Sequence, residues 1–202
     1  SGQAERPQWL RQKASFEAGR ALWLSRTNAF GCRLEVCVSP EDGTLVQWLE
    51  LENTSGALLR LRATSAFAVA LMDEAELRAH PAFYALFVES SLAQDGVLRF
   101  ARRKRAPEET FPLLLHAAAG NARISHETDL ALLVGRDGDL GRAGGIAQSL
   151  SGTVGSVLNP CSALRADVQL APGEKASLCF YIGLCEPCKE MEWINRHQGT
   201  GA

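Results

Sequence analysis

The sequence lacks a charge imbalance, a long apolar run and a hydrophobic leader. Its 202 residues carry a formal net charge of -2, which gives no overall attraction to nucleic acid or to anionic membranes. No apolar stretch approaches the ~18 residues of a membrane-spanning helix. The first residues are mostly polar, unlike those of a signal peptide. These absences predict a soluble, cytoplasmic chain that has no nucleic-acid partner.

Catalytic and metal-binding motifs are also missing. The sequence contains no GxSxG nucleophile motif, and its histidines show neither HxH nor HxxxH spacing. The glycine-rich segment 135–145 lacks the GK[ST] ending of a phosphate-binding loop. Glu89 and Glu108–Glu109 resemble a glycosidase pair in residue type alone, because nothing in the sequence fixes their separation. We expect no catalytic residue, no cofactor and no bound metal.

The six cysteines are interpreted as free, buried thiols in a reducing compartment. Most of them lie among apolar strand residues of a chain that is large enough to form a core without disulfides. Cys185 and Cys188 form a CxxC pair, but this pair follows a strand near the C-terminus and no second pair lies at zinc-site spacing. A packing role is therefore favoured over a zinc or redox role.

Short runs of alternating polarity dominate the sequence and predict β-strands. In 32–39 (CRLEVCVS) the even positions are apolar and the odd positions mostly polar, as in a strand with one buried face. The turn PEDG at 40–43 separates this run from 45–53, and NTSG at 53–56 predicts a hairpin between 45–53 and 58–71. Further strands are predicted at 21–27, 85–91, 96–104, 111–119, 163–170 and 175–184.

Helical signals are few. Asp73 and Glu76 form a capping-box pattern for a helix over 73–79, which Pro81 prevents from continuing. Segment 124–135 starts extended and ends as a helical turn, and MEWINRH at 191–197 begins another helix. The whole pattern predicts an all-β, antiparallel sandwich with about a dozen strands and one or two short helices.

Two polar features near strands are interpreted as structural. The basic run 101–105 (ARRKR) is followed at once by Pro-Glu-Glu, so we interpret it as a solvated strand end and hairpin. His116 follows an apolar run, and we interpret it as a satisfied strand-end residue rather than a metal ligand.

Three ordered segments carry a family resemblance. They are LEVCVSPEDGTLVQWLELENTSG at 34–56, HPAFYALFVES at 80–90 and SLSGTVGSVLNPCSALRADVQLAPGEKASLCFYIGLCE at 149–186. Together they resemble the β-sandwich domain of the glycoside hydrolase family 94 phosphorylases, formerly glycosyltransferase family 36. The similarity is greatest to the phosphorylase-like region of cyclic β-1,2-glucan synthases, and it extends from about residue 20 to 186.

The resemblance implies a supersandwich of the galactose-mutarotase-like type over 1–186, with further family strands expected before Ser1. Residues 187–202 are then expected to start a linker toward an (α/α)6 barrel, which this sequence does not contain and which carries the family's catalytic residues. The implied function is a non-catalytic module that supports the barrel and contacts β-glucan. The parent is expected to be an inner-membrane glycosyltransferase or phosphorylase with this region on the cytoplasmic side, and a homodimer is compatible with the family.

His80, Phe83, Tyr84 and Phe87 are the candidate site residues. In the context of this resemblance, packing against the barrel is favoured over direct contact with a saccharide for HPAFYALFVES. One alternative is an independent carbohydrate-binding module, for which exposed aromatics are needed. Its candidates are Trp9, Trp23, Trp48 and Tyr84. A mutarotase-like epimerase that depends on His80 is a further alternative, which rests on the fold type alone.

Overall fold

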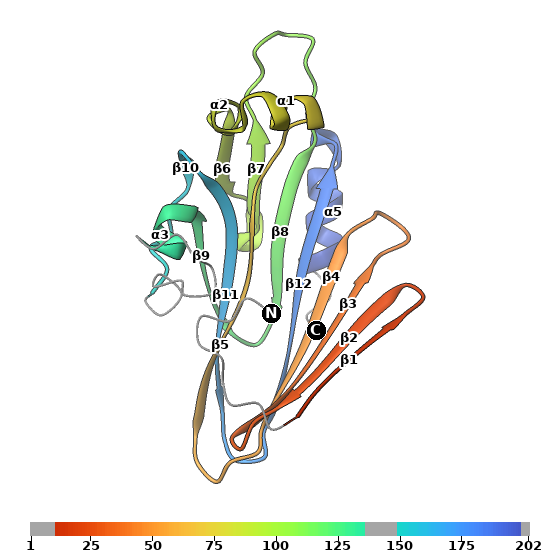
Figure 1. Ribbon diagram of the computed structural model, residues 1–202, viewed down its shortest axis with the longest axis vertical. Helices are drawn as coiled ribbons and strands as arrows, with labels where there is room; N and C mark the ends of the chain where they lie inside the picture. The colour runs from red at the N-terminus through yellow and green to blue at the C-terminus, as the bar shows by residue number, and fades with distance from the viewer. Residues whose placement is uncertain (1–10, 136–148, 199–202) are drawn as a thin grey trace.

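Two antiparallel sheets form the protein. The computed structural model describes residues 11–135 and 149–198 (Figure 1). The larger sheet has nine strands, in the spatial order β1 (Arg11–Glu17), β2 (Arg20–Arg26), β3 (Phe30–Val38), β4 (Leu45–Asn53), β12 (Lys175–Cys185), β8 (Leu113–Gly120), β7 (Leu98–Arg102), β6 (Val88–Leu92) and β10 (Gly155–Ser156). The smaller sheet has the order β5 (Leu59–Ala68), β11 (Pro160–Leu170) and β9 (Arg123–Asp129).

The helices of the described residues are short. The α-helices are α1 (Glu74–Ala79), α2 (Pro81–Ala85), α3 (Leu130–Val134) and α5 (Glu190–Gln198), and the 3-10 helices are η1 (Gln94–Gly96) and η3 (Pro187–Lys189). Figure 1 shows α1 and α2 at one end of the sandwich, and β1 and β2 extending beyond the smaller sheet. None of these helices, within the described residues, has the length and apolar character that a membrane crossing requires.

The main core lies between the two sheets. Strand alternation sends every second side chain of β4, β7 and β12 inward, where the side chains meet the inner face of β11. The buried members include Leu51, Val88, Leu98, Phe100, Leu164, Ala166, Val168, Leu170, Leu178 and Phe180. The predicted all-β, antiparallel sandwich with few short helices is therefore confirmed.

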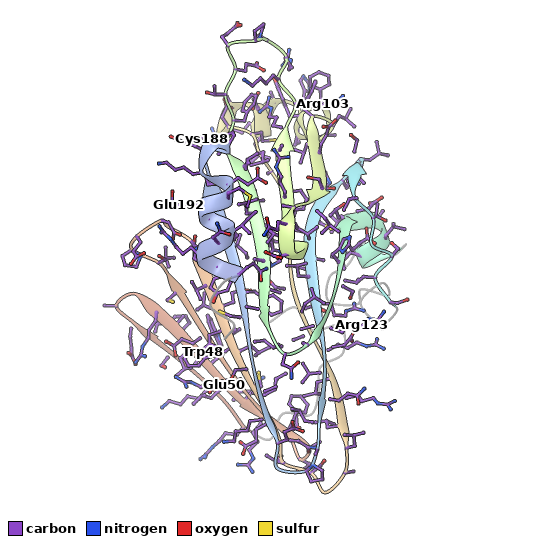
Figure 2. All side chains as sticks on the ribbon, turned by 180° about the vertical axis from the view of Figure 1, so that it is seen from behind. Trp48, Glu50, Arg103, Arg123, Cys188 and Glu192 are labelled. Atoms are coloured by element: carbon purple, nitrogen blue, oxygen red, sulfur yellow. The ribbon has the colours of Figure 1, made fainter. Side chains whose placement is uncertain are left out.

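α5 covers part of the outer face of the nine-stranded sheet, on the side away from the smaller sheet (Figure 2). Trp193 and Ile194 are buried there against Leu115 and its neighbours in the sheet. Trp193 Nε1 also donates a hydrogen bond to Thr44 Oγ1 at 2.8 Å. The sequence predicted this helix correctly, whereas the division of the chain at residue 186 stays a prediction.

The far end of α5 is held by the turn between β3 and β4. His197 Nε2 lies 2.9 Å from Asp42 Oδ2, and Arg196 Nη1 lies 3.4 Å from the same oxygen. Burial raises the pKa of Asp42, but hydrogen bonds from His197 and Thr44 outweigh burial and hold that pKa below its ordinary value. A charged Asp42 therefore anchors the last turn of α5.

The predicted hairpin at 53–56 is wrong. β4 and β5 belong to different sheets, and β5 pairs with β11 from Leu59↔Leu170 to Ala68↔Cys161. The reason lies in Asn53, which is buried and whose Nδ2 donates to Ala57 O and to Leu170 O, both at 2.8 Å. These bonds fix a corner that carries the chain from one sheet to the other.

Other local predictions were tested by the structure. The strands predicted in 21–27, 32–39, 45–53, 111–119 and 175–184 are present, whereas β1 and β10 were not predicted. The six thiols are free, as predicted, but only Cys161 is fully buried and Cys188 is exposed. His116 lies within β8 and not at its end. Trp9 and almost all of the glycine-rich segment 135–145 lie outside the described residues.

Candidate docking surface at the α1–α2 end

The candidate site lies where α1, α2 and the end of β7 meet (Figure 1). α1 begins as predicted: Asp73 Oδ1 accepts a hydrogen bond from Glu76 N at 2.8 Å, and Glu76 Oε2 accepts one from Asp73 N at 3.1 Å. Pro81 ends α1 but also occupies the first turn of α2, where its missing N–H costs nothing. The chain after Pro81 thus forms a second helix, which the sequence did not predict.

α2 brings three of the four predicted residues into one ring cluster. The Phe83 ring packs edge-to-face with Tyr84 at a centroid distance of 5.4 Å and with Phe87 at 5.3 Å. Phe83 remains 48% exposed, whereas Tyr84 and Phe87 are half-buried. His80 joins the two helices through its backbone: its N–H donates to Glu76 O of α1, and its carbonyl accepts from Phe83 N and Tyr84 N of α2. Its side chain is exposed.

Arg102 is the buried polar centre of the site. Its guanidinium donates to both carboxylate oxygens of Glu76, at 2.5 and 2.6 Å, and to Leu71 O at 3.1 Å. The same group lies 5.3 Å from the Tyr84 ring centroid and 4.4 Å from that of Phe111. A part-buried, bidentate ion pair, with its arginine between aromatic rings, fixes the orientation of α1 against β7.

Two further cations cover the ring cluster from outside. Arg103 lies 5.8 Å from the Phe87 ring centroid, and Arg105 lies 5.5 Å from it and 5.9 Å from that of Phe83. Arg103 also pairs with Glu89 at 3.1 Å, and Figure 2 shows Arg103 at this end of the molecule. The basic run 101–105 is therefore not simply a solvated strand end, because it holds Arg102 inside and stacks its neighbours on aromatic rings.

An open pocket of about 540 Å³ adjoins the ion pair. Its lining combines apolar and ionised groups, among them Leu71, Met72, Glu76, Arg102, Phe111 and Leu184. Hydrogen bonds from Arg102 lower the pKa of Glu76 to about 2, against the opposing effect of burial. A general acid needs a raised pKa, so this carboxylate is suited to holding structure and not to donating a proton.

The sequence indicates that Arg102 is buried, but the basic run was interpreted as solvated and this was missed. Leu98, Phe100 and Arg102 occupy alternate positions of β7, and all three are buried. The alternation of this strand therefore directs Arg102 inward. Its partner Glu76 lies 26 residues upstream and has a local role in the capping box, so their pairing was not readable from either segment.

The Glu76–Arg102 pair gives this end a pH dependence. The pKa of Glu76 is about 2 in the folded chain, whereas the ordinary pKa of a glutamate, 4.5, applies to the unfolded chain. The pair therefore stabilises the fold fully above pH 4.5, and this contribution is lost as the pH falls toward 2. We expect Glu76→Gln, which keeps a capping acceptor, to unfold with a weaker pH dependence over this range. Urea denaturation of both chains between pH 5 and 3 measures this, and parallel curves would contradict it.

Comparison with known proteins agrees with the architecture. Residues 6–199 match the family described as "Glycosyl hydrolase 94, supersandwich domain". The cyclic beta-(1,2)-glucan synthase NdvB of Rhizobium meliloti (strain 1021) is 31% identical over 120 residues, which are 56% of this chain and 4% of that protein. The chain thus matches a small part of a far longer relative.

Solved structures show more distant likeness. A putative kojibiose phosphorylase from the human microbiome has 6% identity and a TM-score of 0.43, over 90% of this chain and 20% of that one. A galactose mutarotase-like protein from Clostridium acetobutylicum has 11% identity and a TM-score of 0.41, over 88% of this chain and 66% of that one. Because the family match covers nearly the whole sequence, the chain belongs to the glycosyl hydrolase 94 supersandwich-domain family.

Proposed function

We propose that this chain is the non-catalytic β-sandwich module of an enzyme of the cyclic β-1,2-glucan synthase and family 94 phosphorylase type. In this proposal an (α/α)6 barrel of the parent protein carries out the reaction, and the α1–α2 end of the sandwich packs against that barrel. The family match and the partial similarity to a glucan synthase support the context. Glucan is then the polymer that the parent handles.

The exposed apolar surface of α1 and α2 carries this proposal. Leu77, Phe83 and Leu86 are 47%, 48% and 41% exposed within ten residues of one another. Arg103 lies over the Phe87 ring and Arg105 over the Phe83 ring beside them. Exposed aromatic and aliphatic side chains with arginines at the rim are typical of protein interfaces, where they contribute most of the binding energy.

The carboxylates at this end support a structural role. Glu76 is bound by Arg102 and Glu89 by Arg103, so both are held as ion-pair partners. A glycosidase pair instead needs one carboxylic acid that stays protonated and a second carboxylate at a defined distance. We therefore expect the purified chain, given β-1,2-glucan and inorganic phosphate, to release no glucose 1-phosphate. Turnover by the pure chain would overturn the proposal.

Docking can be tested on the ring cluster. Phe83→Ser removes the exposed ring, and we expect it to weaken association with the (α/α)6 barrel of a family 94 enzyme about tenfold. Hydrogen exchange of the wild-type chain should slow at 80–87 when the barrel is added. Leu132→Ser is the matched control, because Leu132 is 50% exposed on α3, away from this end. Equal effects of the two substitutions would contradict docking at α2.

A further inference from the structure

Beside α5, the outer face of the nine-stranded sheet carries large side chains that the described part of the chain leaves exposed, Trp48 and Leu24 among them. Tyr181 of β12 packs on this face against His197 of α5 at 4.8 Å between ring centroids. Cys179 lies two residues before Tyr181, hence on the same face, and pairs in register with Trp48 of β4. Trp48 and Glu50 therefore lie on the α5 side of the sheet, which is the side viewed in Figure 2.

Strand register places a compact set of side chains there. Leu24, Arg33 and Glu50 are directly opposite one another on β2, β3 and β4. The next row on the same face contains Glu35 and Trp48. We call these five residues the outer-face platform. Their odd-numbered neighbours on β4 point the other way, into the core between the sheets.

Trp48 is the apolar centre of the platform. Its side chain is 42% exposed, although it is a large aromatic on a central part of the sheet. The Arg33 guanidinium lies 5.6 Å from its ring centroid. Arg33 is itself fixed by Glu35 at 2.8 Å and by Glu50 at 2.9 Å. The indole is thus exposed beside planar polar groups that are already held in place.

The charges around Trp48 are nearly balanced. Glu35 also meets Arg20 at 3.5 Å, and Arg20 meets Glu17 at 2.7 Å, so acids and bases alternate in one connected network. Exposed ion pairs contribute little to stability, about 0–1 kcal/mol each. Three carboxylates match the two arginines of this network, so the charge directly beside Trp48 suits a neutral polar ligand better than a polyanion.

A groove extends from the platform across the face. It encloses about 760 Å³, within the roughly 300–1,000 Å³ typical of ligand sites. It adjoins the platform through Leu24, Arg33 and Glu50, whereas Trp48 and Glu35 lie outside its lining. The other charged side chains that line it are Arg11, Lys13, Arg26, Glu52 and Lys175. Gly31 lies between Arg26 and Glu52 in the register, and its missing side chain lowers the floor of the groove.

We propose that the outer-face platform binds a segment of a neutral β-glucan chain. The C–H face of a glucopyranose ring is apolar and stacks on an aromatic ring such as Trp48. Its equatorial hydroxyls can then donate to the carboxylates of Glu35 and Glu50 and accept from Arg33. This site rests on the proposed function, which supplies the polymer, but it is separate from the α1–α2 docking surface. It would hold glucan away from the α1–α2 end, which packs against the barrel in the proposed function.

Titration of the full 202-residue chain with linear β-1,2-glucooligosaccharide tests the site. We expect binding with quenching or a shift of tryptophan fluorescence, and we expect Trp48→Ala to weaken affinity about tenfold or more. Trp48→Leu keeps apolar bulk without a flat ring, so its affinity should fall likewise while its unfolding curve stays cooperative. Glu50→Gln should give a smaller loss. Phe83→Ser is the control and should bind as the wild type does.

An absence of binding at millimolar oligosaccharide, or unchanged affinity in both Trp48 variants, would overturn the site. Binding of inorganic phosphate or a sugar phosphate in place of the neutral glucan, with dependence on Arg26, would assign the groove to anions and also overturn it. The barrel-docking proposal is judged separately, by hydrogen exchange at 80–87, so either can fail without the other.

Discussion

Gly183→Ala destabilises the chain by about 1–3 kcal/mol, the usual cost of overfilling a packed site. A Cβ atom at position 183 would lie 2.4 Å from Trp193 Nε1 and 2.9 Å from Thr44 Oγ1. Trp193 cannot move away cheaply, because it is 4% exposed and its Nε1 donates to Thr44. The added methyl group therefore pushes α5 off the sheet.

Urea unfolding followed by circular dichroism measures the effect, because this signal does not depend on Trp193. Gly31→Ala is the matched control, because it lies in the same sheet and its nearest contact would be Glu52 at 3.8 Å, an ordinary distance. Adding Trp193→Phe removes the nearest of the clashing atoms, Nε1, so Gly183→Ala should cost less in that background. Equal stability of Gly183→Ala and the wild type would show that α5 is not docked as described.

How much of the fold was predictable depends on how local its cause is. The capping box of α1 is set by Asp73 and Glu76 three residues apart, and the sequence predicted it. The alternation of β3 was equally plain. The partner of β5 was not, because Asn53 turns the chain toward β11, whose Leu170 lies 117 residues away. A turn sequence alone does not distinguish a hairpin from a corner between sheets.

The candidate sites follow the same division. Phe83, Tyr84 and Phe87 lie within one helical turn and its exit, so their clustering was predictable from spacing. The contact between Arg102 and Glu76 depends on how α1 lies across β7, which no short segment specifies. Trp48 was one of four candidate aromatics, and only the registers of β3, β4 and β12 show which groups surround it.

Acidification should destabilise the chain through His116. Burial lowers the pKa of this imidazole to about 3, from its ordinary value of 6.5, which applies to the unfolded chain. Between these values the unfolded chain binds a proton that the folded chain does not, so stability is complete above 6.5 and is lost as pH falls toward 3. One such proton changes the free energy of unfolding by up to about 1.4 kcal/mol per pH unit.

The surroundings of His116 explain why the folded chain resists this proton. The ring is fully buried within β8, between Phe67 at 5.2 Å and Phe180 at 6.3 Å. Nδ1 lies 2.7 Å from Ser162 Oγ, and Nε2 has no partner among the described residues. With a second ring proton the imidazole would be a buried cation that has an N–H without an acceptor. Such a buried cation is far less stable than the same group in water.

His116→Leu removes the titration and is the variant to compare. We expect urea unfolding at pH 7, 5 and 4 to show wild-type stability falling relative to that of His116→Leu at each step. Ser162→Ala is the control: it removes the hydrogen bond but leaves the imidazole buried, so its stability should be lower at every pH with the same slope. If the unfolding free energies of the wild type and His116→Leu fell in parallel with pH, the prediction would be wrong. The folded chain would then take up the proton on His116 as readily as the unfolded chain does.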